Sequence, residues 1–229
     1  MTSRTELERN TKYYDEYSEH YDSSRDTHYY NFLVDEEMKI VSQHTRGKKV
    51  LEIGCGTGVL MEWIQKDCNV MGVDLSPGMV RKAQKKGLVV VQGRAEELPH
   101  EADMFDVVYS FKTLPHVSGI AQALTEINRV LKRDGIAFVE FYNRHSVKYV
   151  LNKIAHFFFP RDFFIRYDTI QEIRAACAQT GFEVRNVYGI KFLFPHVFFR
   201  FRIVRWIEHV CQKHLSHFGS FIIFEVKKR

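Results

Sequence analysis

Short apolar runs alternate with longer amphipathic segments along most of the chain. The runs are rich in Val, Ile and Phe, which is typical of buried β-strands. They occupy residues 49–53, 69–73, 88–92, 105–110, 136–142, 182–189 and 220–226. Apolar positions at helical spacing predict helices over residues 59–66, 76–87, 120–131 and 169–180. Strands that alternate with helices indicate a doubly wound, Rossmann-like α/β fold with a mostly parallel seven-stranded sheet.

The pattern changes at both ends of the chain. The first 45 residues have helical spacing only, with Tyr14, Tyr17 and Tyr21 on one face and acidic residues between them that we expect to be solvated. We therefore predict a helical lid over residues 1–45 and a single domain over residues 46–229. The last apolar run comes late in the chain, and we expect it to pair antiparallel at the edge of the sheet, next to the strand before it.

Composition changes this picture mainly near the C-terminus. The net charge is +5, and residues 188–229 hold eight Lys or Arg against two acidic residues. Aromatic insertions lie at about 146–167 and 190–218. The basic aromatic segment fits either an amphipathic helix that packs its aromatics inward or a contact with a membrane surface, nucleic acid or an acidic partner.

The remaining composition bears on the compartment. The N-terminus shows no apolar leader, and no run approaches the length of a membrane span. The four cysteines are scattered, without a Cys-x-x-Cys pair. We therefore expect a cytoplasmic protein with reduced thiols.

A glycine-rich stretch, VLEIGCGTG from Val50 to Gly58, overlaps the first predicted strand. Glycines remove side chains where a ligand lies against backbone, and they adopt dihedral angles that other residues resist. The following helix directs its first N–H groups toward such a ligand. Asp74 ends the next predicted strand, twenty residues after Gly54, where a carboxylate can accept hydrogen bonds from ribose hydroxyls. Together these features predict a nucleoside-bearing cofactor at this edge of the sheet.

Two residues separate the possible classes of cofactor. A dinucleotide-binding turn favours glycine at the position of Val59. Glu52 lies inside the strand, where a negative charge would repel a pyrophosphate and attract a cation. S-adenosylmethionine combines adenosine with a sulfonium and an ammonium group, so it fits this site. A nicotinamide-dependent oxidoreductase is the alternative.

The chain resembles the class I S-adenosylmethionine-dependent methyltransferases that act on small molecules, and is similar to the ubiquinone/menaquinone C-methyltransferases. The segments that carry the resemblance are VLEIGCGTG, GVDLSPGMV, QGRAEELPHEADMFDVVYS, LPHV and EINRVLKRDG, within residues 13–145. It implies a methyltransferase whose cofactor is S-adenosylmethionine. The cofactor contacts that it implies are Glu52, Gly54 and Gly56 at the methionine part, Asp74 at the ribose, Leu75, Met79, Ala95 and Glu96 around the adenine, Ser110 and Phe111 at the methionine end, and Tyr14 and Tyr21 from the lid.

Arg94 departs from the family pattern, because relatives often carry Asp at this position. That Asp accepts a hydrogen bond from the adenine amino group, whereas a guanidinium has no acceptor. We expect Glu96 or a backbone carbonyl to replace it, and we leave Arg94 out of the cofactor site.

His116 is the candidate catalytic residue. Methyl transfer depends mainly on in-line positioning, and an oxygen or acidic carbon nucleophile also needs a general base. An imidazole in the loop after residues 105–110 suits that role, although it equally suits a loop anchor. His145 is a second candidate at the rim, with plain solvation as the alternative. The C-terminal histidines His209, His214 and His217 lack the partners of a zinc motif, so we expect no metal site.

The aromatic insertions predict an apolar acceptor pocket. We expect a small apolar, aromatic or lipid-like acceptor with an oxygen, carbon or nitrogen nucleophile, and no nucleic-acid partner. The arginines of the C-terminal segment suit an acidic substituent or a lipid headgroup, so a peripheral membrane contact is included. We expect a monomer or a homodimer. A non-catalytic, methyltransferase-like protein at a membrane surface and a macromolecular acceptor such as tRNA or protein are the further alternatives.

Overall fold

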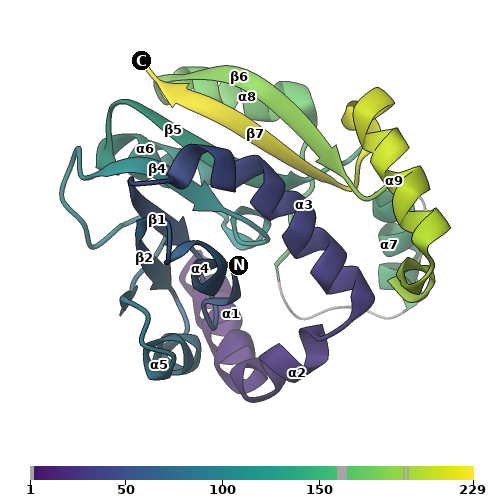
Figure 1. Ribbon diagram of the computed structural model, residues 1–229, viewed down its shortest axis with the longest axis horizontal. Coiled ribbons are helices and arrows are strands. Elements are labelled where there is room, and N and C mark those ends of the chain that lie inside the picture. Colours follow the sequence, from purple (N-terminus) through teal and green to yellow (C-terminus); the bar gives the residue numbers. More distant parts are fainter. Residues whose placement is uncertain (1–2, 159–163, 193, 195) are drawn as a thin grey trace.

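The computed structural model describes residues 3–158, 164–192, 194 and 196–229. Within them, seven strands form one sheet in the order β3-β2-β1-β4-β5-β7-β6 (Figure 1). The strands are β1 (Lys49–Ile53), β2 (Asn69–Asp74), β3 (Val90–Gln92), β4 (Phe105–Ser110), β5 (Leu131–Tyr142), β6 (Phe182–Ile190) and β7 (Phe221–Lys228). The predicted α/β fold is therefore confirmed.

Helices cover both faces of this sheet. The α-helices are α1 (Ser3–Tyr17), α2 (Tyr21–Arg25), α3 (His28–Thr45), α4 (Val59–Ile64), α5 (Pro77–Lys85), α6 (Ile120–Val130), α7 (Val147–Phe158), α8 (Ile170–Gln179) and α9 (Arg202–His214). Short 3-10 helices are η1 (Ser18–His20), η2 (Leu114–His116), η3 (His196–Arg200) and η4 (Ser216–Phe218). Helices α6 and α8 pack into one apolar core and α3, α4 and α5 into the other. The alternation along β1 explains the two cores, since Leu51 and Ile53 face the first and Val50 the second.

The last strand is antiparallel, as predicted, but it does not lie at the edge. β7 pairs antiparallel with both β5 and β6, so β6 is the outer strand. Residues 221–226 are all buried, whereas Arg185 and Asn186 of β6 are exposed. Burial on both faces favours an inner position for β7, and polar residues tolerate the edge.

Several element ends differ from the predicted ones by a few residues, and two differences are larger. Residues 131–142 form one continuous strand, with a shift in register against β4 between Phe105 and Val107. The first aromatic insertion contains a helix, α7, that we did not predict. Among the described residues, no helix combines the length and apolarity needed to cross a bilayer.

Candidate cofactor and acceptor site

A cavity of about 190 Å³ lies where β1, β2 and β4 end, and residues of α1, α2 and α3 form its other wall. All of the predicted site residues except Ser110 and the second rim candidate His145 line it. These are Tyr14, Tyr21, Glu52, Gly54, Gly56, Asp74, Leu75, Met79, Ala95, Glu96, Phe111 and His116. The fold thus brings together residues that are up to about a hundred positions apart in the sequence.

The turn after β1 presents bare backbone to this cavity. Gly54 and Gly56 have φ values of +73° and +55°, a left-handed conformation that favours glycine. A Cβ atom on Gly54 would lie 1.9 Å from Oγ1 of Thr113. A Cβ atom on Gly56 would lie 3.3 Å from Oη of Tyr21, so the turn and α2 face each other closely.

Asp74 connects this turn to the next helix. Its Oδ2 accepts a hydrogen bond from the backbone N–H of Gly56 at 2.7 Å, and its Oδ1 accepts one from Ser76 at 2.9 Å. Burial raises the pKa of this carboxyl, although the backbone N–H groups oppose the shift. Each carboxylate oxygen can accept a second hydrogen bond, so the group retains capacity for ligand hydroxyls.

Glu52 is buried at the base of the cavity, with 3% of its surface exposed. Oη of Tyr109 donates a hydrogen bond to its Oε2 at 2.9 Å. Burial raises the pKa of Glu52 to about 8, although Tyr109 and Lys112 oppose the shift, and this favours the protonated form near neutral pH. This differs from the fixed negative charge that we assumed from the sequence. A cation bound beside it would favour the ionised form and lower the pKa again.

Ser110 is the predicted cofactor contact that does not line the cavity. It is fully buried, and its hydroxyl donates to the carbonyl of Ile53 at 3.0 Å. The side chain therefore ties β4 to β1, while its neighbour Phe111 reaches the cavity.

His116 lines the cavity and also anchors its loop. Its Nδ1 lies 2.9 Å from the carbonyl oxygen of Phe164. Since a carbonyl only accepts, Nδ1 carries the proton, and the neutral ring has its lone pair on Nε2. Burial lowers the pKa of His116, which favours this neutral form. His145, by contrast, is exposed and outside the cavity lining.

Two acidic residues that stay partly exposed to solvent, as we expected, also hold the N-terminal segment against the cavity. Oδ1 of Asp15 accepts a hydrogen bond from the backbone N–H of Gly78 at 2.6 Å, at the start of α5. The hydroxyl of Thr57, in the glycine-rich turn, donates to Asp22. These bonds position the segment that carries Tyr14 and Tyr21, whose pKa values are raised by burial.

Sequence reasoning missed Arg25, which also lines the cavity. Its Cζ lies 3.9 Å from the ring centroid of Tyr21 and 5.0 Å from that of Tyr30. Its Nε is buried without a hydrogen-bond partner among the described residues. The position of Arg25, one helical turn after Tyr21, is the signal that could have identified it.

Arg94 also lines the cavity, although we left it out of the site. Its Nη2 lies 3.6 Å from Oε1 of Glu96. The two predicted neighbours of the adenine, Ala95 and Glu96, are therefore accompanied by a cation that is paired with the second of them.

Lys112 is a further lining residue that no motif indicated. Its backbone is left-handed, with φ of 57°, and its N–H donates to Oε1 of Glu140 at 3.0 Å. Its ammonium group pairs with Glu37, which is 1% exposed. Burial raises the pKa of Glu37, and it raises the pKa of Glu140 to about 8. These two buried acids, Glu37 and Glu140, thus hold the loop that follows β4 through Lys112.

The groups that line the cavity are suited to S-adenosylmethionine. Bare backbone beside Asp74 suits adenosine, and the buried acid with two tyrosine rings suits a sulfonium or ammonium group. The unpartnered Nε of Arg25 suits a carboxylate. Among the described residues, no group of His, Cys, Asp and Glu is arranged to hold a metal ion.

Known proteins resemble this chain over most of its length. Residues 51–139 match the family described as a methyltransferase domain. An uncharacterized protein of Methanocaldococcus jannaschii is 27% identical, over 95% of this chain and 90% of that protein. A ubiquinone biosynthesis O-methyltransferase of Pseudomonas aeruginosa is 29% identical, over 64% of this chain and 69% of that enzyme. The crystal structure of an S-adenosylmethionine-dependent methyltransferase from Thermotoga maritima shares the fold, with a TM-score of 0.70, 24% identity, and 96% and 99% of the two chains covered.

The fold is that of an α/β protein with a cavity at the carboxyl edge of its sheet, which is where such folds bind nucleoside-bearing ligands. The matched methyltransferase domain and these relatives support a class I S-adenosylmethionine-dependent methyltransferase, whose fold the chain shares. Its cofactor is S-adenosylmethionine, and the alternative of a nicotinamide-dependent oxidoreductase is set aside.

Proposed function

We propose that this methyltransferase acts on a small apolar, aromatic or lipid-like acceptor that bears a hydroxyl group. One observation carries the proposal: the cavity that holds Asp74 and the glycine-rich turn continues to Tyr30, Val34 and Val117. Such side chains favour an apolar ligand. The names of two relatives support an oxygen nucleophile, namely the ubiquinone biosynthesis O-methyltransferase and the (+)-O-methylkolavelool synthase of Herpetosiphon aurantiacus, which is 34% identical over 60% of this chain and 51% of that enzyme.

The cofactor residues of the proposal are those predicted from the sequence, without Ser110 and with Arg25. Asp74 accepts hydrogen bonds from the ribose hydroxyls, and the turn at Gly54 and Gly56 lies against the amino-acid part. Arg25 binds the carboxylate of that part by charge-assisted hydrogen bonds. Glu52 responds to the positive charge by ionising. The cofactor supplies an electrophilic methyl group on a sulfonium, so the protein has mainly to position the acceptor.

Residues 1–45 act as a lid in this proposal. Tyr14, Tyr21 and Arg25 come from this segment, and the hydrogen bonds of Asp15 and Asp22 hold it against the glycine-rich turn and the start of α5.

The compartment of the proposal is the cytoplasm. The cysteines Cys55, Cys68, Cys177 and Cys211 are all free thiols, which supports this compartment.

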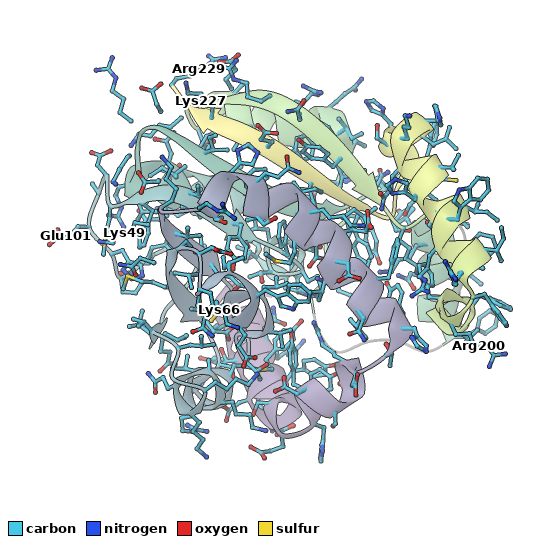
Figure 2. The ribbon with its side chains drawn as sticks, viewed as in Figure 1. Lys49, Lys66, Glu101, Arg200, Lys227 and Arg229 are labelled. Atoms are coloured by element: carbon cyan, nitrogen blue, oxygen red, sulfur yellow. The ribbon has the colours of Figure 1, made fainter. Side chains whose placement is uncertain are left out.

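Replacement of Asp74 tests the cofactor assignment. We expect Asp74→Ala to weaken binding of S-adenosylhomocysteine by about 1–3 kcal/mol, because hydrogen bonds to a charged group are lost. Isothermal titration calorimetry measures this, and Glu101→Ala is the matched control, because Glu101 is exposed, is not part of the cavity lining and lies at the left margin of the molecule in Figure 2. An unchanged dissociation constant for Asp74→Ala would contradict the role in ribose binding.

Replacement of His116 tests the general base. We expect His116→Ala to lower kcat by about 10²–10⁴-fold and to leave cofactor affinity unchanged, because proton removal from the hydroxyl is lost. His116→Gln keeps a donor for the carbonyl of Phe164 but has no basic nitrogen. If the glutamine variant restores turnover, His116 only anchors its loop.

The acceptor is tested by transfer of a labelled methyl group. The enzyme and cofactor are incubated with a panel of hydroxylated aromatic compounds, isoprenoid alcohols, tRNA and protein extract. Label in an apolar small molecule supports the proposal, whereas label confined to tRNA or protein rejects it.

A further inference from the structure

Helix α7 turns its apolar face away from the protein. Val147, Val150, Leu151, Ile154 and Phe158 follow the spacing i, i+3, i+4, i+7 and i+11, and each is between 49% and 67% exposed. The opposite side of the helix faces the protein. There, Nδ2 of Asn152 donates to Oη of Tyr167 at 2.7 Å, and the rings of Tyr149 and Tyr167 are 5.0 Å apart.

Helix α9 has the same character. Ile203, Trp206 and Val210 are exposed along one side, with Trp206 at 62%. The side toward the sheet holds Val204 and Glu208, both buried. We predicted that aromatic residues of this segment pack inward. Phe199 of η3 does so and is fully buried, whereas Trp206 points outward.

The two helices adjoin the same end of the sheet. α7 follows the end of β5, and α9 with η4 lies between the end of β6 and the start of β7. The amide of Asn143 donates to the carbonyls of His217 and Gly219 at 2.9 Å each. Nζ of Lys148 lies 4.1 Å from the ring centroid of Phe221. Figure 1 shows α7 and α9 at one side of the molecule, beyond the end of α3.

Charge distinguishes the possible occupants of this surface. Glu208 is the one acidic residue in α7, η3, α9 and η4. It is buried, and its carboxylate accepts hydrogen bonds from the backbone N–H groups of Phe192 and Phe194. The basic residues at exposed positions of these elements are Lys153, Arg200, Arg202 and Lys213, and Figure 2 shows Arg200 at the outer margin. The exposed surface therefore combines apolar residues with positive charge.

We propose that α7, η3, α9 and η4 dock the enzyme on the surface of an anionic lipid bilayer. A helix with Trp and aliphatic residues on one side and Lys or Arg beside them is suited to the interface between headgroups and acyl chains. Each basic residue near an anionic leaflet adds attraction. A second copy of the chain would bring the same positive charges together, and nucleic acid would gain nothing from exposed Val, Leu and Ile. Bilayer docking does not require a lipid-like acceptor, so it stands or fails separately from the proposed substrate.

Tryptophan fluorescence provides a direct test. The sequence has two Trp residues, and Trp63 is exposed on α4, a helix that Figure 1 shows apart from α7 and α9. In a Trp63→Phe protein, Trp206 reports alone. With vesicles of phosphatidylcholine and phosphatidylglycerol, we expect a blue shift of its emission and quenching by brominated acyl chains. We expect the binding to weaken with added salt, because screening acts on exposed charges.

Matched variants separate the contributions. Arg202→Gln with Lys213→Gln should weaken partitioning roughly thirtyfold, since each basic residue near the leaflet contributes about a fivefold gain. Leu151→Ser with Ile154→Ser should weaken it at least tenfold, because apolar area no longer leaves water. Val89→Ser, at an exposed position elsewhere, is the control and should change nothing. Binding of S-adenosylhomocysteine by every variant checks that the fold is intact.

Three results would overturn the proposal. The first is no blue shift with anionic vesicles in the Trp63→Phe protein. The second is equal binding to vesicles of phosphatidylcholine alone, insensitive to salt. The third is a blue shift that depends on protein concentration without vesicles, accompanied by a dimer in analytical ultracentrifugation, since a second copy would then cover the surface.

Discussion

Helices α6 and α7 have nearly the same pattern of apolar residues but opposite surroundings. In α6, Ile120, Ala123, Leu124, Ile127 and Val130 are spaced i, i+3, i+4, i+7 and i+10, and all are buried against the sheet. In α7 the corresponding stripe is exposed. We call the sheet and the helices packed on it the closed side of the molecule, because they cover their own apolar residues. We call α7 and α9 the open side, because they present apolar residues to the surroundings.

This contrast shows what helical periodicity encodes. Apolar residues at this spacing make an amphipathic helix in both cases, but the spacing does not specify what covers the stripe. The charges beside the stripe differ between the two helices. Polar groups of α6 include Glu126, whose carboxylate accepts hydrogen bonds from Arg129 and from the N–H of Leu98. α7 and α9 have cations beside the stripe and no exposed acid among the described residues.

The largest expected effect is on the closed side. Ile127→Ala should lower the free energy of unfolding by about 3–4 kcal/mol, because a fully buried side chain is removed from the core and leaves a cavity. Urea denaturation followed by circular dichroism measures the change. A loss below about 1 kcal/mol would mean that α6 is packed no better than α7.

The buried acid of the closed side gives the second effect. The raised pKa of Glu52, about 8, means that the folded state keeps a proton that the unfolded state has released. Its contribution to stability is complete below the unfolded pKa of about 4.5, falls as the pH rises, and is lost above about 8. Tyr109, Lys112, Glu37 and Asp74 are the charged or titratable groups that act on it.

Glu52→Gln should therefore remove part of the pH dependence of stability. From pH 5 to pH 9, the free energy of unfolding of the native chain should fall by about 2 kcal/mol more than that of the variant. This is less than the full pKa shift implies, because relaxation and water weaken the effect of burial. Urea denaturation at both pH values measures the difference, with Glu101→Gln as the control. An unchanged dependence on pH would indicate that Glu52 is ionised in the folded chain.

Local signals in the sequence predicted most of the closed side and little of the open side. β1 begins and ends as predicted, because its apolar run is bounded by polar residues and glycine, and the ends of β4 also match the prediction. The turn at Gly54 and the carboxylate of Asp74 meet in the cavity, since parallel strands end at one edge of a sheet. Asp15 and Asp22 could not be assigned from spacing, because their partners Gly78 and Thr57 lie far away in the sequence. Similarly, Trp206 lies on an amphipathic helix in either orientation, and only tertiary contacts decide which side is covered.

The smallest expected effect on stability is at Ile154, the counterpart of Ile127 in α7. The chemical change in Ile154→Ala is identical, but this side chain is 55% exposed, so its loss should alter the free energy of unfolding by less than about 0.5 kcal/mol. The same variant should weaken binding to anionic vesicles measurably, because part of the proposed docking surface is removed. Urea denaturation and vesicle co-sedimentation of Ile127→Ala and Ile154→Ala, each compared with the native chain, complete the test. A loss of stability at Ile154 comparable to that at Ile127 would show that α7 is covered within the protein, and the contrast between the two helices would disappear.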